Sequence, residues 1–230
     1  MNFFYAPLEC WNKDRTIVEI KDQEAVHISK VLRQNVGDQI LVADGIGNHS
    51  KCEITDISKR SVTAKVFETI SEVEPGVQKV MAFGAIKKRD RLEFAIEKAV
   101  ELDAWEICIF DANHSERSRI NEERLQTQIV SAFKQSGRFF LPKLVIKKSL
   151  NEVFEHYADH NPIMAYLGDE KTEKTGALTH LKNLLLVGPE GGFSKREADL
   201  TKERGGKFIS LGENRLRAET AVVAFLARYL

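Results

Sequence analysis

Apolar and polar residues alternate along much of the first seventy residues. The alternation is clearest in 61–66 (SVTAKV), where every second side chain is apolar, as in a strand with one buried face. In 22–32 the apolar residues instead recur at helical spacing, which predicts one helix within this part. The pattern therefore predicts a small β module with a single helix. Its expected strands are 3–5, 16–20, 39–43, 52–57 and 61–70.

From Lys79 onward, short apolar runs alternate with segments of helical spacing. Runs such as Leu184–Val187 have no polar face, so both faces of the strand are expected to be buried. Repeated alternation of strands and helices predicts an α/β fold with a parallel sheet covered on both faces. The expected strands are 80–86, 106–110, 144–146, 163–167, 184–187 and 208–211. The expected helices are 91–102, 122–135, 150–157, 178–181, 195–203 and 218–229.

A polar segment at 71–78 (SEVEPGVQ) separates the two patterns. It combines acidic residues with a Pro-Gly pair, which is typical of a connection between domains. A chain of 230 residues is long enough for two domains. We therefore expect an N-terminal domain at 1–72 and a C-terminal α/β domain at 73–230.

The composition, with 43% hydrophobic and 30% charged residues, excludes a disordered or collagen-like chain. The longest apolar runs are far shorter than the roughly 20 residues that a membrane span needs. The first residues, MNFFYAPLEC, also lack the basic region and apolar stretch of a signal peptide. We therefore expect a cytoplasmic protein with no membrane partner.

Neither the cysteines nor the histidines predict a metal site. Cys10, Cys52 and Cys108 lie tens of residues apart, so reduced thiols are expected rather than a disulfide framework or a zinc ribbon. His156 and His160 share one helical face, but no third ligand adjoins them in the sequence.

Charge is balanced globally and clustered locally. The 34 basic residues equal the 34 acidic ones, whereas nucleic-acid-binding proteins usually have a basic excess. Two segments are nevertheless basic: 134–148, with five Lys and Arg and no acid, and 87–91, where Asp90 is the one acid. Because phosphate contacts depend on local potential, either segment can bind RNA or form ordinary solvated surface.

Glycine-containing turns follow three of the expected strands. GPEGGF follows 184–187, and the next residues, Ser194 to Glu197, fit the capping box that opens a helix. LGENRLR ends the 208–211 strand and leads into another helix, while Gly168 follows 163–167. Glycines let backbone groups approach a ligand closely, and parallel sheets bind ligands at the carboxyl ends of their strands. The three turns together predict one ligand site.

Several motifs carry a resemblance to a known family. GPEGGFS-x-x-E at 188–197 is followed by LG-x-x-x-LR-x-ETA at 211–221. Shorter motifs accompany them: H-x-x-x-V-L-R at 27–33, K-A-x-E-L at 98–102 and QSGR at 135–138. Together they resemble the ribosomal RNA small-subunit uridine N3-methyltransferases, within the SPOUT superfamily of trefoil-knotted methyltransferases.

The resemblance implies a fold, a cofactor and partners. It implies a PUA-like β-barrel RNA-binding domain at the N-terminus and a SPOUT knotted parallel-sheet domain at the C-terminus. It also implies S-adenosyl-L-methionine as methyl donor and a homodimer whose sites borrow residues from the second subunit. The substrate implied is a uridine in small-subunit (16S-type) ribosomal RNA, either as naked RNA or in the assembled subunit.

Some positions depart from the family pattern LG-x-RILRTETA. Asn214 replaces its first arginine, Arg215 its isoleucine and Ala218 a threonine, and Lys134 stands where a glutamate is usual before Gln135. The three glycine turns are unaffected, so the cofactor is implied more directly than the target base. Two alternatives stay open: methylation of another rRNA or tRNA position, and a non-catalytic RNA-binding or ribosome-assembly module.

The resemblance implies the residues that bind the cofactor, and local charge predicts those that contact RNA. Those expected to bind the cofactor are Leu167, Gly168, Val187, Gly188, Glu190, Gly191, Gly192, Leu211, Gly212 and Leu216. Those expected to contact RNA, by their charge and place in the motifs, are His27, Lys30, Arg33, Lys87, Arg89, Arg138 and Lys143.

Transfer to N3 of uracil requires a group that stabilises negative charge. Loss of the N3 proton leaves charge on the two flanking carbonyl oxygens, and a fixed guanidinium is suited to that position. Arg217, at the start of a helix beside the expected cofactor turn, is the first candidate, and Arg138 is the second. Alternatively, Arg217 pairs with Glu219 or with a phosphate. No proton acceptor is evident in the sequence.

Overall fold

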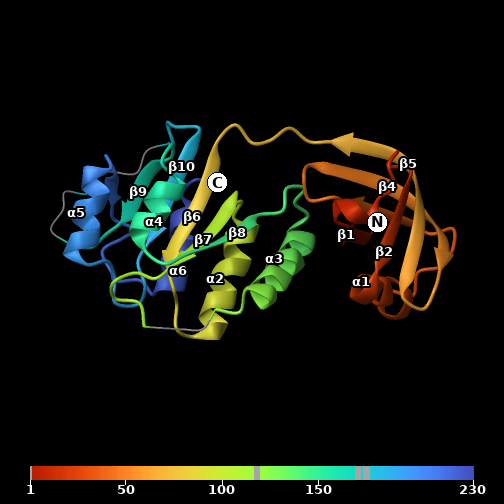
Figure 1. Cartoon of the computed structure of the whole chain (residues 1–230), viewed down its shortest axis with the longest axis horizontal. Helices are drawn as coiled ribbons and strands as arrows, with labels where there is room; N and C mark the ends of the chain where they lie inside the picture. Colours follow the sequence, from red (N-terminus) through yellow and green to blue (C-terminus); the bar gives the residue numbers. More distant parts are fainter. Residues whose placement is uncertain (1, 117–119, 169–171, 173–176) are drawn as a thin grey trace. The chain divides into compact units, whose positions relative to one another are not determined.

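The computed structural model describes residues 2–116, 120–168, 172 and 177–230 (Figure 1). The chain separates into two compact units. The N-terminal unit contains Met1–Glu74 together with Phe133–Leu141, and the C-terminal unit contains Pro75–Ala132 and Pro142–Leu230.

A five-stranded half-barrel sheet forms the N-terminal unit, with the strand order β1-β3-β4-β5-β2. β1 runs parallel to β3, and the other neighbours are antiparallel. Alternate residues such as Val62 and Ala64 of β5 are fully buried, which confirms the predicted alternation. The expected helix at 22–32 is an α-helical turn followed by a π-helical turn. The bounds are β1 Asn2–Tyr5, β2 Ile17–Lys21, α1 Asp22–Val26, the π turn His27–Val31, β3 Gln39–Ala43, β4 Asn48–Ile57 and β5 Ser61–Ser71.

The segment Phe133–Leu141 packs on this sheet although it is sixty residues away in sequence. The Phe139 ring stacks on the His49 imidazole with 3.8 Å between ring centroids. Phe140 covers Gly47, where an added Cβ would lie 2.5 Å from the Phe140 ring and φ is +101°. The Gly47 amide donates to the Phe139 carbonyl oxygen at 2.9 Å. Phe139 and Phe140 therefore contribute to the packing of this unit.

The C-terminal unit contains a six-stranded sheet in the order β11-β9-β10-β6-β7-β8, and all its strand pairs are parallel. This confirms the predicted parallel α/β sheet. Side chains from β6, β7 and β10 form one buried cluster with α4 and α5, while α6 packs on β6, β10 and α2. The strands are β6 Gln78–Gly84, β7 Glu106–Phe110, β8 Lys143–Lys147, β9 Asn161–Ala165, β10 Lys182–Val187 and β11 Lys207–Ile209. The helices are α2 Arg89–Glu101, α3 Glu122–Ser136, α4 Leu150–His156, α5 Lys195–Glu203 and α6 Ala218–Ala227.

Two expectations for this unit were wrong in detail. The helix expected at 178–181 does not form: these residues are irregular, and Leu181 is 71% exposed. β6, β9 and β11 end two residues earlier than expected, at Gly84, Ala165 and Ile209. Leu167 and Leu211 consequently lie in turns beyond the sheet. None of the helices in the described ranges is long and apolar enough to cross a membrane.

Candidate active site

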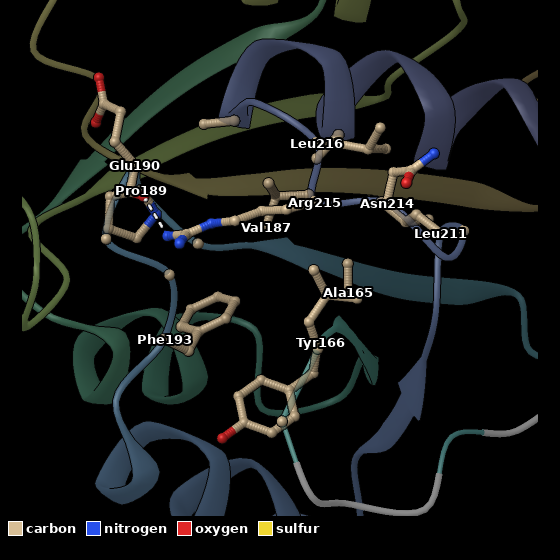
Figure 2. A pocket seen from close by; sticks show the side chains of 18 residues that line it. Ala165, Tyr166, Val187, Pro189, Glu190, Phe193, Leu211, Asn214, Arg215 and Leu216 are labelled. Carbon is tan, nitrogen blue, oxygen red and sulfur yellow. Dashed lines mark hydrogen bonds between the residues drawn. The ribbon is translucent and has the colours of Figure 1, made fainter.

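The three glycine turns surround a cavity at the carboxyl ends of β9, β10 and β11, which are neighbours in the sheet (Figure 2). The cavity measures about 410 Å³, within the usual range for a small-molecule site. All ten residues expected to bind the cofactor line it. They are Leu167, Gly168, Val187, Gly188, Glu190, Gly191, Gly192, Leu211, Gly212 and Leu216.

Glycine is required at several points of the 188–192 turn. A Cβ on Gly188 would lie 3.0 Å from the Gly192 carbonyl carbon, and a Cβ on Gly191 would lie 2.6 Å from the Cβ of His114. Gly192 has φ +72°, and its amide donates to the Pro189 carbonyl oxygen at 2.8 Å. The backbone is thus folded too tightly for larger residues, which leaves peptide groups at the cavity wall.

A hydrogen-bonded layer supports this turn. Ser194 opens α5 through the predicted capping box, with its amide donating to Glu197 Oε2 at 2.8 Å. The amide of Asn113, after β7, donates to Glu197 Oε1 at 2.9 Å, and Asn113 Nδ2 donates to Ser194 Oγ at 2.8 Å. Sequence reasoning identified the capping box and missed Asn113. Its position after the carboxyl end of a buried strand was the available signal.

The cavity wall combines apolar side chains with backbone peptide groups, and this combination fits a nucleoside. Figure 2 shows the side chains of Tyr166, Val187, Phe193 and Leu216 around the space, and peptide groups of the turns complete its rim. Apolar side chains suit the faces of a planar base, and peptide groups suit its polar edge. The residues present therefore fit an adenosine-containing cofactor.

Arg217 is the residue immediately before α6, and its side chain is exposed. Its carbonyl oxygen accepts the first helical hydrogen bond, from Ala221 at 2.8 Å. Arg217 does not line the cavity, but the residue directly before it, Leu216, does. Glu219 pairs with Arg91 of α2 at 3.4 Å, so the alternative of an Arg217–Glu219 ion pair is wrong for the described part of the chain.

Arg138, the second catalytic candidate, lies in a different unit. It belongs to the Phe133–Leu141 segment of the N-terminal unit and is half-buried, whereas Arg217 belongs to the C-terminal unit. The two arginines are therefore not brought together within one compact unit.

The remaining candidates for RNA contact are exposed on both units. His27, Lys30 and Arg33 lie on or just after the helical segment of the N-terminal unit. In the C-terminal unit, Lys87 Nζ donates a hydrogen bond to Glu116 Oε2, and Arg89 Nε lies 3.6 Å from Glu93 Oε1. Lys143 Nζ likewise lies 4.0 Å from Glu106. Acidic neighbours thus reduce the local positive potential at these three residues.

Within 2–116, 120–168, 172 and 177–230, no group of three or more His, Cys, Asp and Glu side chains is arranged to hold a metal ion. His156 and His160 instead pack against the Tyr157 ring, at centroid distances of 4.6 and 5.0 Å.

Two family models match the chain. A model described as "RNA methyltransferase domain" matches residues 74–230, and one described as "RNA methyltransferase PUA domain" matches residues 20–67. The first match covers the six-stranded parallel sheet, helices α2 to α6 and the cavity.

Individual relatives agree with the family models. Ribosomal RNA small subunit methyltransferase E of Bacillus subtilis (strain 168) is 30% identical over 217 residues, covering 88% of this chain and 85% of the relative. The protein of that name from Rickettsia conorii is 30% identical over 220 residues, covering 92% and 88%.

Solved structures show the same fold. A probable rRNA-methyltransferase from Porphyromonas gingivalis superimposes with a TM-score of 0.84 at 31% identity, covering 99% of this chain and 96% of that one. Ribosomal RNA small subunit methyltransferase E from Neisseria gonorrhoeae, bound to S-adenosyl methionine, gives a TM-score of 0.81 at 26% identity, covering 99% and 95%. The chain therefore belongs to the RNA methyltransferase family that includes ribosomal RNA small subunit methyltransferase E.

Proposed function

We propose that this protein methylates N3 of a uridine in small-subunit ribosomal RNA, with S-adenosylmethionine as methyl donor. The observation that carries the proposal is the cavity at the ends of β9, β10 and β11, whose wall contains all ten residues expected to bind the donor. Membership of the RNA methyltransferase family and the S-adenosyl methionine bound to the Neisseria relative support it.

The three turns would hold the donor mainly through their backbone. Peptide groups of 188–192 and 211–216 would bond the polar edge of the adenine, and Leu211 and Leu216 would pack on its faces. The donor supplies a methyl group already activated on a sulfonium. The protein therefore has to orient the acceptor nitrogen in line with that methyl group and exclude competing water.

Arg217 would stabilise the acceptor. Its exposed guanidinium follows the turn that lines the cavity, which suits it to the negative charge that spreads over the uracil carbonyl oxygens when N3 loses its proton. Solvent would accept that proton. Arg138 is the second candidate for this role.

The N-terminal unit would hold the RNA. Its match to the RNA methyltransferase PUA domain supports this role, and so do the exposed His27, Lys30 and Arg33. Lys87, Arg89 and Lys143 would add phosphate contacts from the C-terminal unit. The proposal includes the functional division into 1–72 and 73–230, the SPOUT trefoil knot after Val187 and Leu211, a homodimer, and action in the cytoplasm.

Two measurements test the proposal together. Calorimetry with S-adenosylmethionine is expected to show stoichiometric binding, and a non-catalytic RNA-binding module would show none. Nucleoside mass spectrometry of small-subunit rRNA from a deletion strain is expected to show loss of one N3-methyluridine. Loss of a different modification from that rRNA would instead assign another rRNA position or a ribose hydroxyl as the target, and loss of a tRNA modification in the same strain would assign a tRNA.

A further inference from the structure

Arg215 occupies an unusual place in the cavity, where the family pattern has isoleucine. It lines the space and is exposed, and its Nη2 donates to the carbonyl oxygen of Glu190 at 3.0 Å. Figure 2 shows its side chain reaching from the 211–217 turn toward the 188–192 turn, with this hydrogen bond at its end. A guanidinium is thereby held at the cavity rim by the backbone of the facing turn.

Charge within the cavity wall is otherwise sparse. Among the described residues that line it, Glu190 and Arg215 are the charged ones. Glu190 Oε1 accepts a hydrogen bond from the Lys87 amide at 3.2 Å, and Figure 2 shows this carboxylate pointing away from the other lining side chains. Arg215 is therefore the cation available to a ligand in this part of the wall.

A guanidinium in this position suits a carboxylate. It carries five N–H donors in a planar fork, and an Nη2 N–H donates to the Glu190 carbonyl oxygen. Among the described residues no other hydrogen bond of this guanidinium is found, so its remaining donors can make a bidentate contact. The methyl donor has one anionic group, the carboxylate of its amino-acid portion, and burying that group without a cation or several donors is costly. The apolar side chains of the wall offer neither.

We propose that Arg215 binds the carboxylate of the methyl donor and selects for donors that carry it. This inference rests on the proposed function, because it takes the cavity to be the donor site. It assigns a specificity role to a lining position where this chain has a cation in place of the isoleucine of the pattern LG-x-RILRTETA.

The inference can be tested with two methyl-donor compounds that differ only in the presence of the carboxylate. Calorimetry would compare S-adenosylmethionine with its decarboxylated form on the wild type, Arg215→Ala and Arg215→Lys, with Arg204→Ala as control. Arg204 is exposed at the end of α5 and does not line the cavity. Because Arg215 is exposed, its replacements are expected to leave the thermal unfolding midpoint without ligand unchanged.

The expected result is a loss of discrimination. Arg215→Ala should weaken binding of S-adenosylmethionine by about 10- to 100-fold, as for one charged hydrogen-bonded contact, and leave the affinity for the decarboxylated form unchanged. Arg215→Lys should retain part of the preference, and Arg204→Ala all of it.

Other results would overturn the inference. Equal weakening of both donors would mean that Arg215 only ties the two turns together through the Glu190 carbonyl. Unchanged affinity for both donors with weaker RNA binding would assign Arg215 to a phosphate. Failure of S-adenosylmethionine to bind the wild type would instead reject the proposed function itself.

Discussion

The two units bury their sheets differently, and this difference determines where each can hold a ligand. In β5 of the N-terminal unit, buried and accessible residues alternate, so one face of the strand remains free for side-chain contacts. In β10 of the C-terminal unit, every residue from Asn183 to Val187 is buried. The faces of such a sheet are covered, and only its strand ends are open to a ligand.

The chemistry available at each place differs accordingly. The N-terminal unit presents individual basic side chains on its surface, and each would contribute a separable phosphate contact in the proposed function. The strand ends of the C-terminal unit present closely folded turns, in which Gly188 and Gly191 have no room for a side chain. We therefore expect single substitutions to have moderate effects in the first unit and large, position-specific effects in the second.

The largest expected effect is that of Arg217→Ala in the C-terminal unit. Removing a guanidinium that stabilises developing charge should lower single-turnover methyl transfer by about 100- to 1000-fold. Affinity for S-adenosylmethionine should stay within about twofold, since Arg217 does not line the cavity. Arg204→Ala is the matched control. Wild-type turnover in Arg217→Ala would remove it from the mechanism.

Phe139→Ala tests the packing of the N-terminal unit. The loss of its stacking on His49 should lower the free energy of unfolding by about 2 kcal/mol in urea titrations. Phe67→Ala is a suitable control because Phe67 is 53% exposed. If stability were unchanged and RNA affinity fell, the Phe139 ring would be a base-stacking platform.

Gly191→Ala tests the close folding of the glycine turn. Its new methyl group would lie 2.6 Å from the Cβ of His114, so the turn has to shift. Calorimetry should show about tenfold weaker binding of S-adenosylmethionine. Gly76→Ala, where an added Cβ meets nothing within 4 Å, should bind normally. Equal affinities in the two variants would show that the turn tolerates a shift.

The smallest expected effect concerns one buried thiol in each unit. Burial raises the pKa of Cys52 and of Cys108 from 9.0 to about 12. Below pH 9 both thiols are protonated in the folded and in the unfolded chain, so their ionisation does not affect the free energy of unfolding. Between pH 9 and 12 only the unfolded chain ionises its thiols, and the free energy of unfolding therefore decreases as the pH rises. The loss should reach roughly 1 kcal/mol per thiol by about pH 9.7.

Urea titrations at pH 8 and pH 9.7 would measure this loss. Replacing either thiol, in Cys52→Ala or Cys108→Ala, should make the decrease with pH shallower than in the wild type. An identical decrease in all three proteins would mean that the thiols ionise equally in the folded and unfolded chains.

Local sequence patterns predicted the secondary structure well where burial is regular. The alternation in 61–66 and the apolar run of Leu184–Val187 both correspond to strands with the expected burial. The helix at 178–181 was expected from two leucines in a four-residue segment. Leu181 is 71% exposed in the structure, so little of its side chain is buried in a way that would stabilise a helix there. Periodicity over four residues is too short to specify a helix.

The candidate site was predictable to the extent that it depends on glycine turns after strands. Turn positions are local properties, and the rule for parallel sheets brings their ends together. Contacts between distant segments carry no such local signal. The Arg91–Glu219 pair and the stacking of Phe139 on His49 join residues about ninety or more positions apart, and neither was expected.

The contribution of Phe133–Leu141 to the N-terminal unit limits how this protein can be dissected. A fragment that ends at Glu74 would lack the Phe139 ring that covers His49, and also the Phe140 ring that fills the space over Gly47. The N-terminal unit therefore cannot be transferred to another protein as a single continuous segment. A graft onto another enzyme has to bring this later stretch of chain along with it.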